Sequence, residues 1–158
     1  MKATSVSLLL CSSGKHAIGV PLEQIVEVVP AFSMKTASVG GDHIAGLINF
    51  KGNVLAVIDG GICVQGAPTV LHPRHKFIIV RSATGHAALL VEDVNDLVMI
   101  KIEDEEENAF ISCSDHRIQR IMMHGSDMVF VLDLDACLST PEEHSAQTIL
   151  RPVPTAEG

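Results

Sequence analysis

Short apolar runs separated by glycine-bearing turns recur along this chain, and they limit its fold more than any other feature. Two apolar runs joined by a short turn of Gly and polar residues predict a β-hairpin. Four segments have this form, at residues 6–22, 44–58, 77–91 and 118–134. Strands at this spacing favour an all-β sandwich or barrel over alternating strands and helices. Little helix is expected, apart from a short one starting at Asp135–Leu138 and stopped by Pro141.

The hairpins also form an internal repeat. The hairpin around Gly14 matches the one around Gly85, and the hairpin around Gly52 matches the one around Gly125. This order predicts two related β units of about 70 residues each. Units of that size can form five-stranded barrels but are unstable unless they pack on one another. We expect two units, with strands free to be exchanged between them, and then a flexible tail, at approximately residues 5–70, 71–140 and 141–158.

Composition predicts a packed domain and narrows its partners. Of the 158 residues, 47% are hydrophobic, which is too high a share for a disordered chain. No apolar run approaches the ~20 residues that cross a bilayer, so we expect no direct membrane insertion. The net charge is -8 and Trp and Tyr are absent, so nucleic acid is a poor partner. The apolar run before Cys11 is too short for a signal peptide, and a cytoplasmic protein is expected.

Metal chemistry has little support in the residue pattern. His72 and His75 stand three apart and, with Cys63 or Cys113, have the side chains of a tetrahedral zinc site. However, Pro73 lies between the two histidines in an apparent loop, and the chain has no Cys-x-x-Cys pair. We therefore expect no metal and no cofactor. Four cysteines are expected to be reduced thiols that pack as small apolar side chains, at Cys11, Cys63, Cys113 and Cys137.

Catalytic motifs are not found in the sequence. There is no Gly-x-Ser-x-Gly turn, no P-loop and no Gly-x-Gly-x-x-Gly segment that opens a helix. Asp59 and Asp133 occupy matching places after two hairpins, where a turn-forming role is simpler than acid–base catalysis. The acidic run Glu103–Glu107 is typical of a solvated loop. The chain is therefore predicted not to be an enzyme.

The most specific stretch covers residues 44–59. It consists of two apolar strands with a single basic residue, Lys51, and Gly52 at the turn between them. Gly46 permits a bend or a close backbone approach, and Gly52 permits a positive φ. A lone Lys between apolar strands either extends to water or pairs with a carboxylate. Glu27, isolated among apolar residues, is the candidate partner.

This stretch resembles the hallmark of the CheW-like domain family. That hallmark is Gly-hydrophobic-hydrophobic-Asn-hydrophobic-Arg-Gly, followed by a strand ending in Val-hydrophobic-Asp. Here it reads Gly46-Leu47-Ile48-Asn49-Phe50-Lys51-Gly52 and then Val57-Ile58-Asp59. Three further segments resemble the family in the right order, at residues 18–28, 90–97 and 129–134. The resemblance covers roughly residues 5–140, almost the whole chain.

The resemblance implies a fold of two small five-stranded SH3-like barrels packed on a shared hydrophobic core. It also implies a non-catalytic adaptor in chemotaxis-type signalling. Such an adaptor couples methyl-accepting chemoreceptors to a CheA-type histidine kinase. The cytoplasmic tip of the receptor, a helical hairpin, would dock between the barrels. The barrel faces would pair with the matching barrels of the regulatory domain of the kinase.

Carried over by position, the resemblance also implies a partner-binding surface. Glu27 and Lys51 would form a charged pair near the receptor groove. The other residues implied to line or shape this surface are Ile25, Gly46, Asn49, Gly52, Val94 and Leu97. In recognition of this kind, apolar anchors supply affinity and flanking charges supply register.

Departures from the family pattern leave other functions open. The usual Arg is Lys51, which lacks the planar fork that holds a carboxylate with two bonds. The usual Pro and Leu of the following strand and its end are Ala56 and Gly60. One alternative is an adaptor for a pilus- or gliding-type array. Others are a small-molecule sensing module that uses the groove between the barrels, and a metalloprotein that uses His72 and His75.

Overall fold

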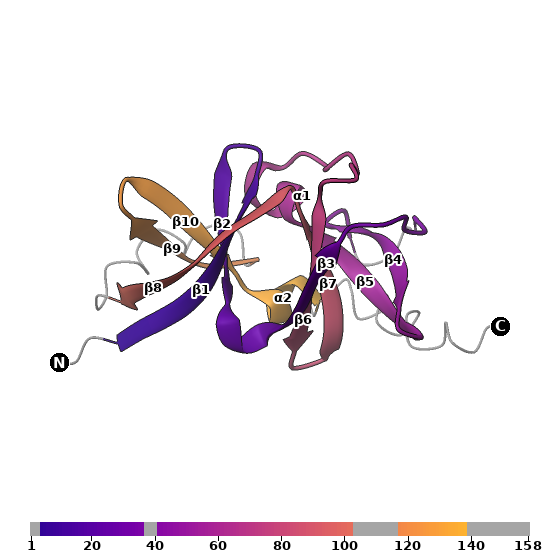
Figure 1. Ribbon diagram of the computed structural model, residues 1–158, viewed down its shortest axis with the longest axis horizontal. Helices are drawn as coiled ribbons and strands as arrows, with labels where there is room; N and C mark the ends of the chain where they lie inside the picture. Colours follow the sequence, from indigo (N-terminus) through magenta and orange to yellow (C-terminus); the bar gives the residue numbers. More distant parts are fainter. Residues whose placement is uncertain (1–3, 37–40, 103–116, 139–158) are drawn as a thin grey trace.

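The computed structural model describes residues 4–36, 41–102 and 117–138, whose strands form two five-stranded sheets (Figure 1). The first sheet has the order β8-β1-β2-β10-β9 and the second the order β3-β6-β7-β5-β4. The strands of the first are β1 (Thr4–Ser13), β2 (His16–Pro21), β8 (Asp93–Ile102), β9 (Ile118–His124) and β10 (Asp127–Leu132). Those of the second are β3 (Ile25–Pro30), β4 (Ile44–Phe50), β5 (Asn53–Asp59), β6 (Lys76–Ser82) and β7 (Gly85–Val91). We call the two sheets the first and the second unit.

Helix is scarce, as expected. Among the described residues it comprises the 3-10 turn η1 (Leu22–Gln24) and the α-helices α1 (Gly60–Gln65) and α2 (Leu134–Leu138). None of the described helices is long and apolar enough to cross a membrane. The predicted all-β architecture of two small five-stranded units is confirmed. The acidic run at 103–107 and the tail at 141–158 lie outside the described residues.

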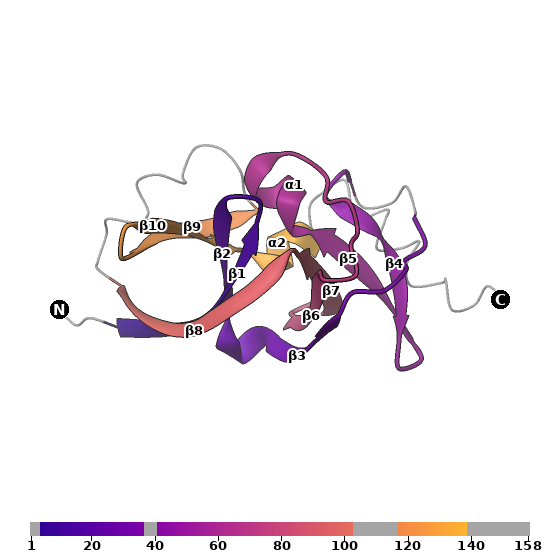
Figure 2. The ribbon, with the colours of Figure 1, turned by 45° about the horizontal axis from the view of Figure 1, so that its top comes forward.

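All four expected hairpins are present, as β1–β2, β4–β5, β6–β7 and β9–β10. The two sheets have the same strand order once β1–β5 is matched with β6–β10. Each sheet combines the first two strands of one half of the sequence with the last three strands of the other half. The halves join through the antiparallel pairs β1–β8 and β3–β6 and through the parallel pairs β2–β10 and β5–β7, and Figure 2 shows β8, β9 and β10 grouped with β1 and β2. The two sequence repeats thus meet near residue 70. Each structural unit, however, is built from strands of both repeats.

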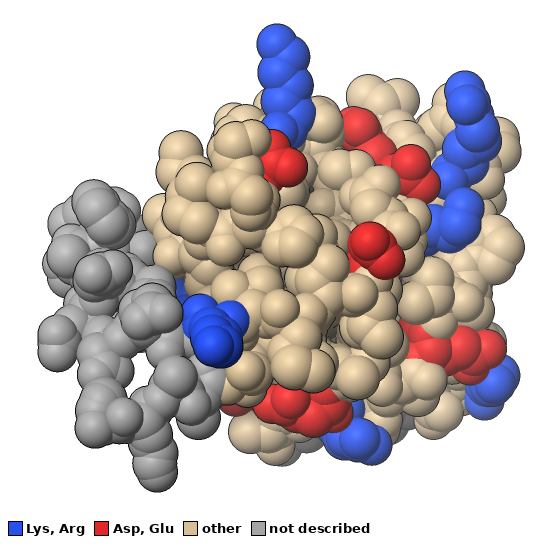
Figure 3. Space-filling model, turned by 60° about the vertical axis from the view of Figure 1, so that its left-hand side comes forward, with Lys and Arg blue, Asp and Glu red and all other residues tan. Residues whose placement is uncertain are grey.

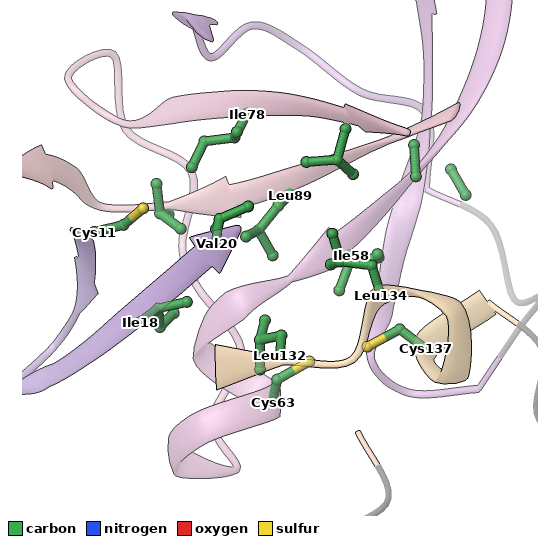
Figure 4. Close-up of a cluster of buried hydrophobic side chains, with 14 of the residues drawn as sticks. Cys11, Ile18, Val20, Ile58, Cys63, Ile78, Leu89, Leu132, Leu134 and Cys137 are labelled. Atoms are coloured by element: carbon green, nitrogen blue, oxygen red, sulfur yellow. The ribbon is translucent and has the colours of Figure 1, made fainter. Parts of the chain in front are cut away.

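The core has three parts, because the central strands are buried on both faces. Successive residues of a strand point to opposite faces. In β6 and β7, Ile78 and Leu89 face the core shared by the two units, whereas Phe77 and Leu90 face the interior of the second unit. Ile18 contributes to the shared core from the first unit (Figure 4). The apolar runs of these strands lack polar alternation because the strands are buried on both faces.

The matched aspartates have a larger role than strand-end turns. Asp59 is buried, and its Oδ1 accepts hydrogen bonds from Gly61 N at 2.8 Å and Ile62 N at 3.4 Å, which makes it the N-cap of α1. Asp133 Oδ1 accepts a hydrogen bond from Ala136 N at 3.0 Å in the first turn of α2. Helix α1 was not predicted from the sequence, because its Gly-Gly start is a poor helix signal and the capping role of Asp59 depends on the folded structure.

Two of the cysteines lie in the short helices. Cys11 is in β1, but Cys63 is in α1 and Cys137 in α2. All three are free and buried, in agreement with small apolar packing. Cys113 lies outside the described residues.

Candidate functional site

Lys51 and Glu27 form an ion pair between the two edges of the second sheet. Lys51 Nζ lies 3.1 Å from Glu27 Oε1. Glu27 is on β3 and Lys51 is in the β4–β5 turn, and β3 and β4 are the edge strands of this sheet. The side chains are 68% and 41% exposed for Lys51 and Glu27, and a pair this exposed contributes less than about 1 kcal/mol to stability. Both charges therefore remain accessible to a partner.

A two-residue turn presents the Lys51 ammonium. Lys51 and Gly52 have φ angles of 54° and 87°, the positive values of a type I′ turn between the paired residues Phe50 and Asn53. Gly52 N donates a hydrogen bond to Asn49 Oδ1 at 2.9 Å. Lys51 Nζ also lies 5.1 Å from the centroid of the Phe50 ring, within cation–π range. These contacts hold the Lys51 side chain in position in the absence of a partner.

The chain after β3 approaches β4 closely at Gly46. Lys35 N donates to Leu47 O at 2.9 Å, and Leu47 N donates to Lys35 O at 2.8 Å, so the chain after β3 pairs with β4. A Cβ atom on Gly46 would lie 2.5 Å from Lys35 O. The expected close backbone approach at Gly46 is confirmed, and this buried residue shapes the site from within.

The apolar residues of the expected surface are spread over both units. Ile25 on β3 and Val94 at the start of β8 are half-buried and pack against the shared core from different sheets. Leu97, farther along β8, is 54% exposed. The contacts described for Lys51, with Glu27 among them, all lie within the second unit. The structure thus groups the charged pair with its turn and places Leu97 on the other sheet.

The second unit also has exposed apolar side chains that were not predicted from the sequence. Val26 and Val28 flank Glu27 on β3 and are 44% and 38% exposed, and Val54, just after the turn, is 42% exposed. The β3 sequence is apolar on both sides of Glu27, so no alternation signals which residues face outward. Exposure alternates along β3, so Val26 and Val28 lie on one face of the strand and Glu27 lies on the other.

At the two matching positions of the first unit, both among the described residues, the residues carry no charge. By the strand registers, the position of Glu27 corresponds to Val98 on β8, because Glu27 pairs with Ile79 and Val98 pairs with its repeat counterpart Leu8. Lys51 corresponds to Gly125 in the β9–β10 turn. The two units therefore present different chemistry at matching places.

The first unit exposes three methionine side chains. Met123 and Met128 are cross-strand partners and are each 56% exposed, and Met99 on β8 is 69% exposed. We call these residues and Leu97 the methionine surface. Figure 3 turns this end of the molecule forward and shows a largely uncharged area with scattered acidic and basic side chains around it. Flexible, polarizable Met side chains adapt readily to apolar protein surfaces.

His72 and His75 lie beside a groove of about 800 Å³. Their ring centroids are 5.5 Å apart, and His72 Nδ1 accepts a hydrogen bond from Arg74 N at 3.0 Å. The groove lies between the loop before β6 and the start of β8, and Lys76 and Glu92 are among its other lining residues. Within the described ranges, no group of three or more His, Cys, Asp or Glu side chains is placed to hold a metal ion.

Comparison with known proteins gives one family and one fold. The family model described as CheW-like domain matches residues 7–142. Among solved structures, the chain is similar to the scaffolding protein TtCheW from Thermoanaerobacter tengcongensis, with a TM-score of 0.71 and 20% sequence identity. That match covers 88% of this chain and 91% of the other. No curated protein sequence matches.

Proposed function

This chain belongs to the CheW-like domain family, and we propose that it is a non-catalytic adaptor in a chemotaxis-type signalling array. In this role it couples the cytoplasmic tips of methyl-accepting chemoreceptors to a CheA-type histidine kinase, on the cytoplasmic side of the membrane. The similar scaffolding protein TtCheW supports the scaffold fold.

The observation that carries the receptor part of the proposal is the pre-positioned charged pair. Lys51 and Glu27 are held together at the edges of the second sheet, and Val54, close to the turn in the sequence, adds exposed apolar surface. A helix laid on such a surface gains affinity from its apolar side chains and register from a matching charge. Lys51 presents a point charge on a fixed turn, which suits a receptor carboxylate without the two-bond geometry that Arg provides.

The methionine surface supports the kinase part of the proposal. An exposed group of large apolar side chains is typical of protein interfaces. The regulatory domain of a CheA-type kinase has the same fold, and its barrels would pair with the barrel faces of this chain. The charged pair lies on the second unit and the methionine surface on the first. We therefore assign the receptor to the second unit and the kinase to the first.

Binding measurements test the proposal. We expect the purified protein to bind a receptor tip and a CheA regulatory domain at micromolar affinity. Lys51→Glu places two like charges together and should weaken receptor binding by about tenfold or more, equivalent to 1.4 kcal/mol. Its melting temperature should stay nearly unchanged, because the exposed pair adds little stability. The double variant Glu27→Lys with Lys51→Glu exchanges the two charges. It should restore the ion pair within the protein but not receptor binding, because the charges then face the receptor in the wrong order.

Lys15→Glu is the matched control, because Lys15 is an exposed lysine in the β1–β2 turn, away from the pair. It makes the same change in net charge and should leave receptor binding unchanged. A protein that binds neither a chemoreceptor nor a histidine kinase would refute the proposal. Binding of a receptor and kinase from a pilus- or gliding-type system would instead assign the adaptor to that array.

A second candidate function is small-molecule sensing in the groove beside His72. Its lining includes Arg74 and Lys76 as well as Glu92 and Asp93, which suits a ligand that carries charges of both signs. A rise in melting temperature with amino acids or other small zwitterions, without a protein partner, would favour this function. Arg74→Ala should then abolish the rise.

A further inference from the structure

Two cysteines at repeat-related positions meet in the shared core. Cys63 in α1 is the fourth residue after Asp59, and Cys137 in α2 is the fourth residue after Asp133. Both belong to the buried cluster between the units, and Figure 4 shows their sulfur atoms turned toward one another. The Cys137 thiol is hydrogen bonded to the Cys63 side chain. The repeat thus brings two thiols together in the shared core.

We propose that Cys63 and Cys137 are a redox site, at which a peroxide forms a reversible disulfide that links α1 to α2. The Cys63 thiolate attacks one oxygen of hydrogen peroxide, the O–O bond breaks, and the leaving hydroxide takes up the thiol proton as water. Cys63 is then a sulfenic acid. The Cys137 sulfur attacks the Cys63 sulfur, the S–O bond breaks, and the proton of Cys137 leaves with the hydroxide as a second water. Two thiols and one peroxide thus give one disulfide and two waters.

The environment of each thiol assigns its role. Cys63 is 4% exposed and Cys137 is 0% exposed, so peroxide reaches Cys63 first. The hydrogen bond to Cys63, with burial, raises the pKa of Cys137 well above its usual value, so Cys137 keeps its proton until the second step. Burial also makes the first step slow, because the thiolate is the reactive form and the oxidant must enter the core. The site therefore responds to sustained exposure to peroxide.

Cys11 provides an internal comparison within the same core. Burial, together with the nearby Asp93 carboxylate, raises its pKa to about 12. Its thiol donates a hydrogen bond to Leu9 O at 3.7 Å. The buried Cys11 thiol thus donates its hydrogen bond to a backbone carbonyl. The Cys63 and Cys137 thiols are instead hydrogen bonded to one another, and both are free thiols.

The disulfide would join the two halves of the sequence. It closes a loop of about 75 residues, and cross-links of long loops strongly reduce the entropy of the unfolded chain. We expect the melting temperature to rise by roughly 5–15 °C on oxidation and to return on reduction. The link ties together the two units, between which the shared core lies.

Mass spectrometry of the full-length protein tests the proposal. Reduced protein treated for hours with hydrogen peroxide should lose two hydrogens, and peptide mapping should join the segments that contain residues 63 and 137. Cys63→Ala should prevent the cross-link, whereas the variant with Cys11→Ala and Cys113→Ala should form it normally. A second arm refolds the reduced, unfolded chain in a glutathione redox buffer, which removes the barrier of access to the core.

Three results would overturn the proposal. One is a cross-link that uses Cys11 or Cys113 in place of the pair. Another is oxidation of Cys63 to sulfinic acid without a cross-link. The third is a 63–137 bond in neither the peroxide arm nor the refolding arm. None of these results bears on adaptor function, because the experiment contains no signalling partner.

Discussion

Replacing Asp59 with Ala removes one buried carboxylate that serves both a helix and a loop. Oδ1 accepts hydrogen bonds from Gly61 N at 2.8 Å and from Thr69 Oγ1 at 2.6 Å, and Oδ2 accepts one from Thr69 N at 2.9 Å. Asp59 is only 2% exposed, so water cannot readily replace these bonds. The substitution therefore leaves the start of α1 uncapped and the Thr69 donors without an acceptor.

The expected loss follows from these two effects. Loss of an N-cap costs about 1 kcal/mol. A buried donor left without a partner costs about 1–3 kcal/mol more. Together they reduce the free energy of unfolding by about 2–4 kcal/mol, which lowers the melting temperature of a chain of this size by roughly 5–15 °C. Urea denaturation followed by circular dichroism measures this change, with an unchanged m-value as the sign that the same structure unfolds.

Asp133→Ala is the matched control from the other repeat. Asp133 is half-buried, and its side chain accepts a hydrogen bond from Ala136 N at 3.0 Å. We expect this variant to lose only the cap contribution of about 1 kcal/mol. Asp59→Asn should be intermediate, because one amide oxygen can keep one group of donors while the NH₂ faces the other. Equal losses for Asp59→Ala and Asp133→Ala would refute the reasoning that the loop contacts of Asp59 matter.

Further predictions concern backbone contacts, pH and packing. Gly46→Ala should cost about 2 kcal/mol or more, because its Cβ would meet Lys35 O at 2.5 Å, whereas Gly52→Ala has open space and should cost only the ~1 kcal/mol of its positive φ; similar losses in urea would contradict this. Burial raises the pKa of Cys11 from 9.0 to about 12, so the folded state keeps a proton that the unfolded state loses. The free energy of unfolding should therefore fall as pH rises from 9 toward 12, and Cys11→Ala should reduce that slope. Phe77→Ala should cost about 3–5 kcal/mol, because Phe77 is fully buried, whereas Phe32→Ala, at a 40% exposed neighbour, should cost much less.

Local features of the fold could be predicted where the physics is local. A glycine-bearing turn between apolar runs specifies a hairpin by itself, and the β1–β2 and β6–β7 hairpins are present with Gly14 and Gly85 at positive φ. The contact between Lys51 and Glu27 was also predictable, since Glu27 is an isolated charge in an apolar strand and Lys51 is a lone basic residue in the turn between two apolar strands. The functional role of the pair remains a prediction. The exposed Val26 and Val28 could not be found, because an apolar strand does not reveal its outward face.

The sequence by itself therefore determined the hairpins, the internal repeat and the candidate charged pair, all of which depend on neighbouring residues or on simple matching along the chain. The tertiary structure decided that β8–β10 join β1 and β2, and that β3–β5 join β6 and β7. It also decided that Asp59 holds Thr69 and that Cys63 meets Cys137. These contacts depend on which apolar faces pack against one another. The two halves of the sequence have similar apolar strands, so the strands of one half have suitable pairing partners in both halves. Only the packing of both units on one shared core selects among those pairings.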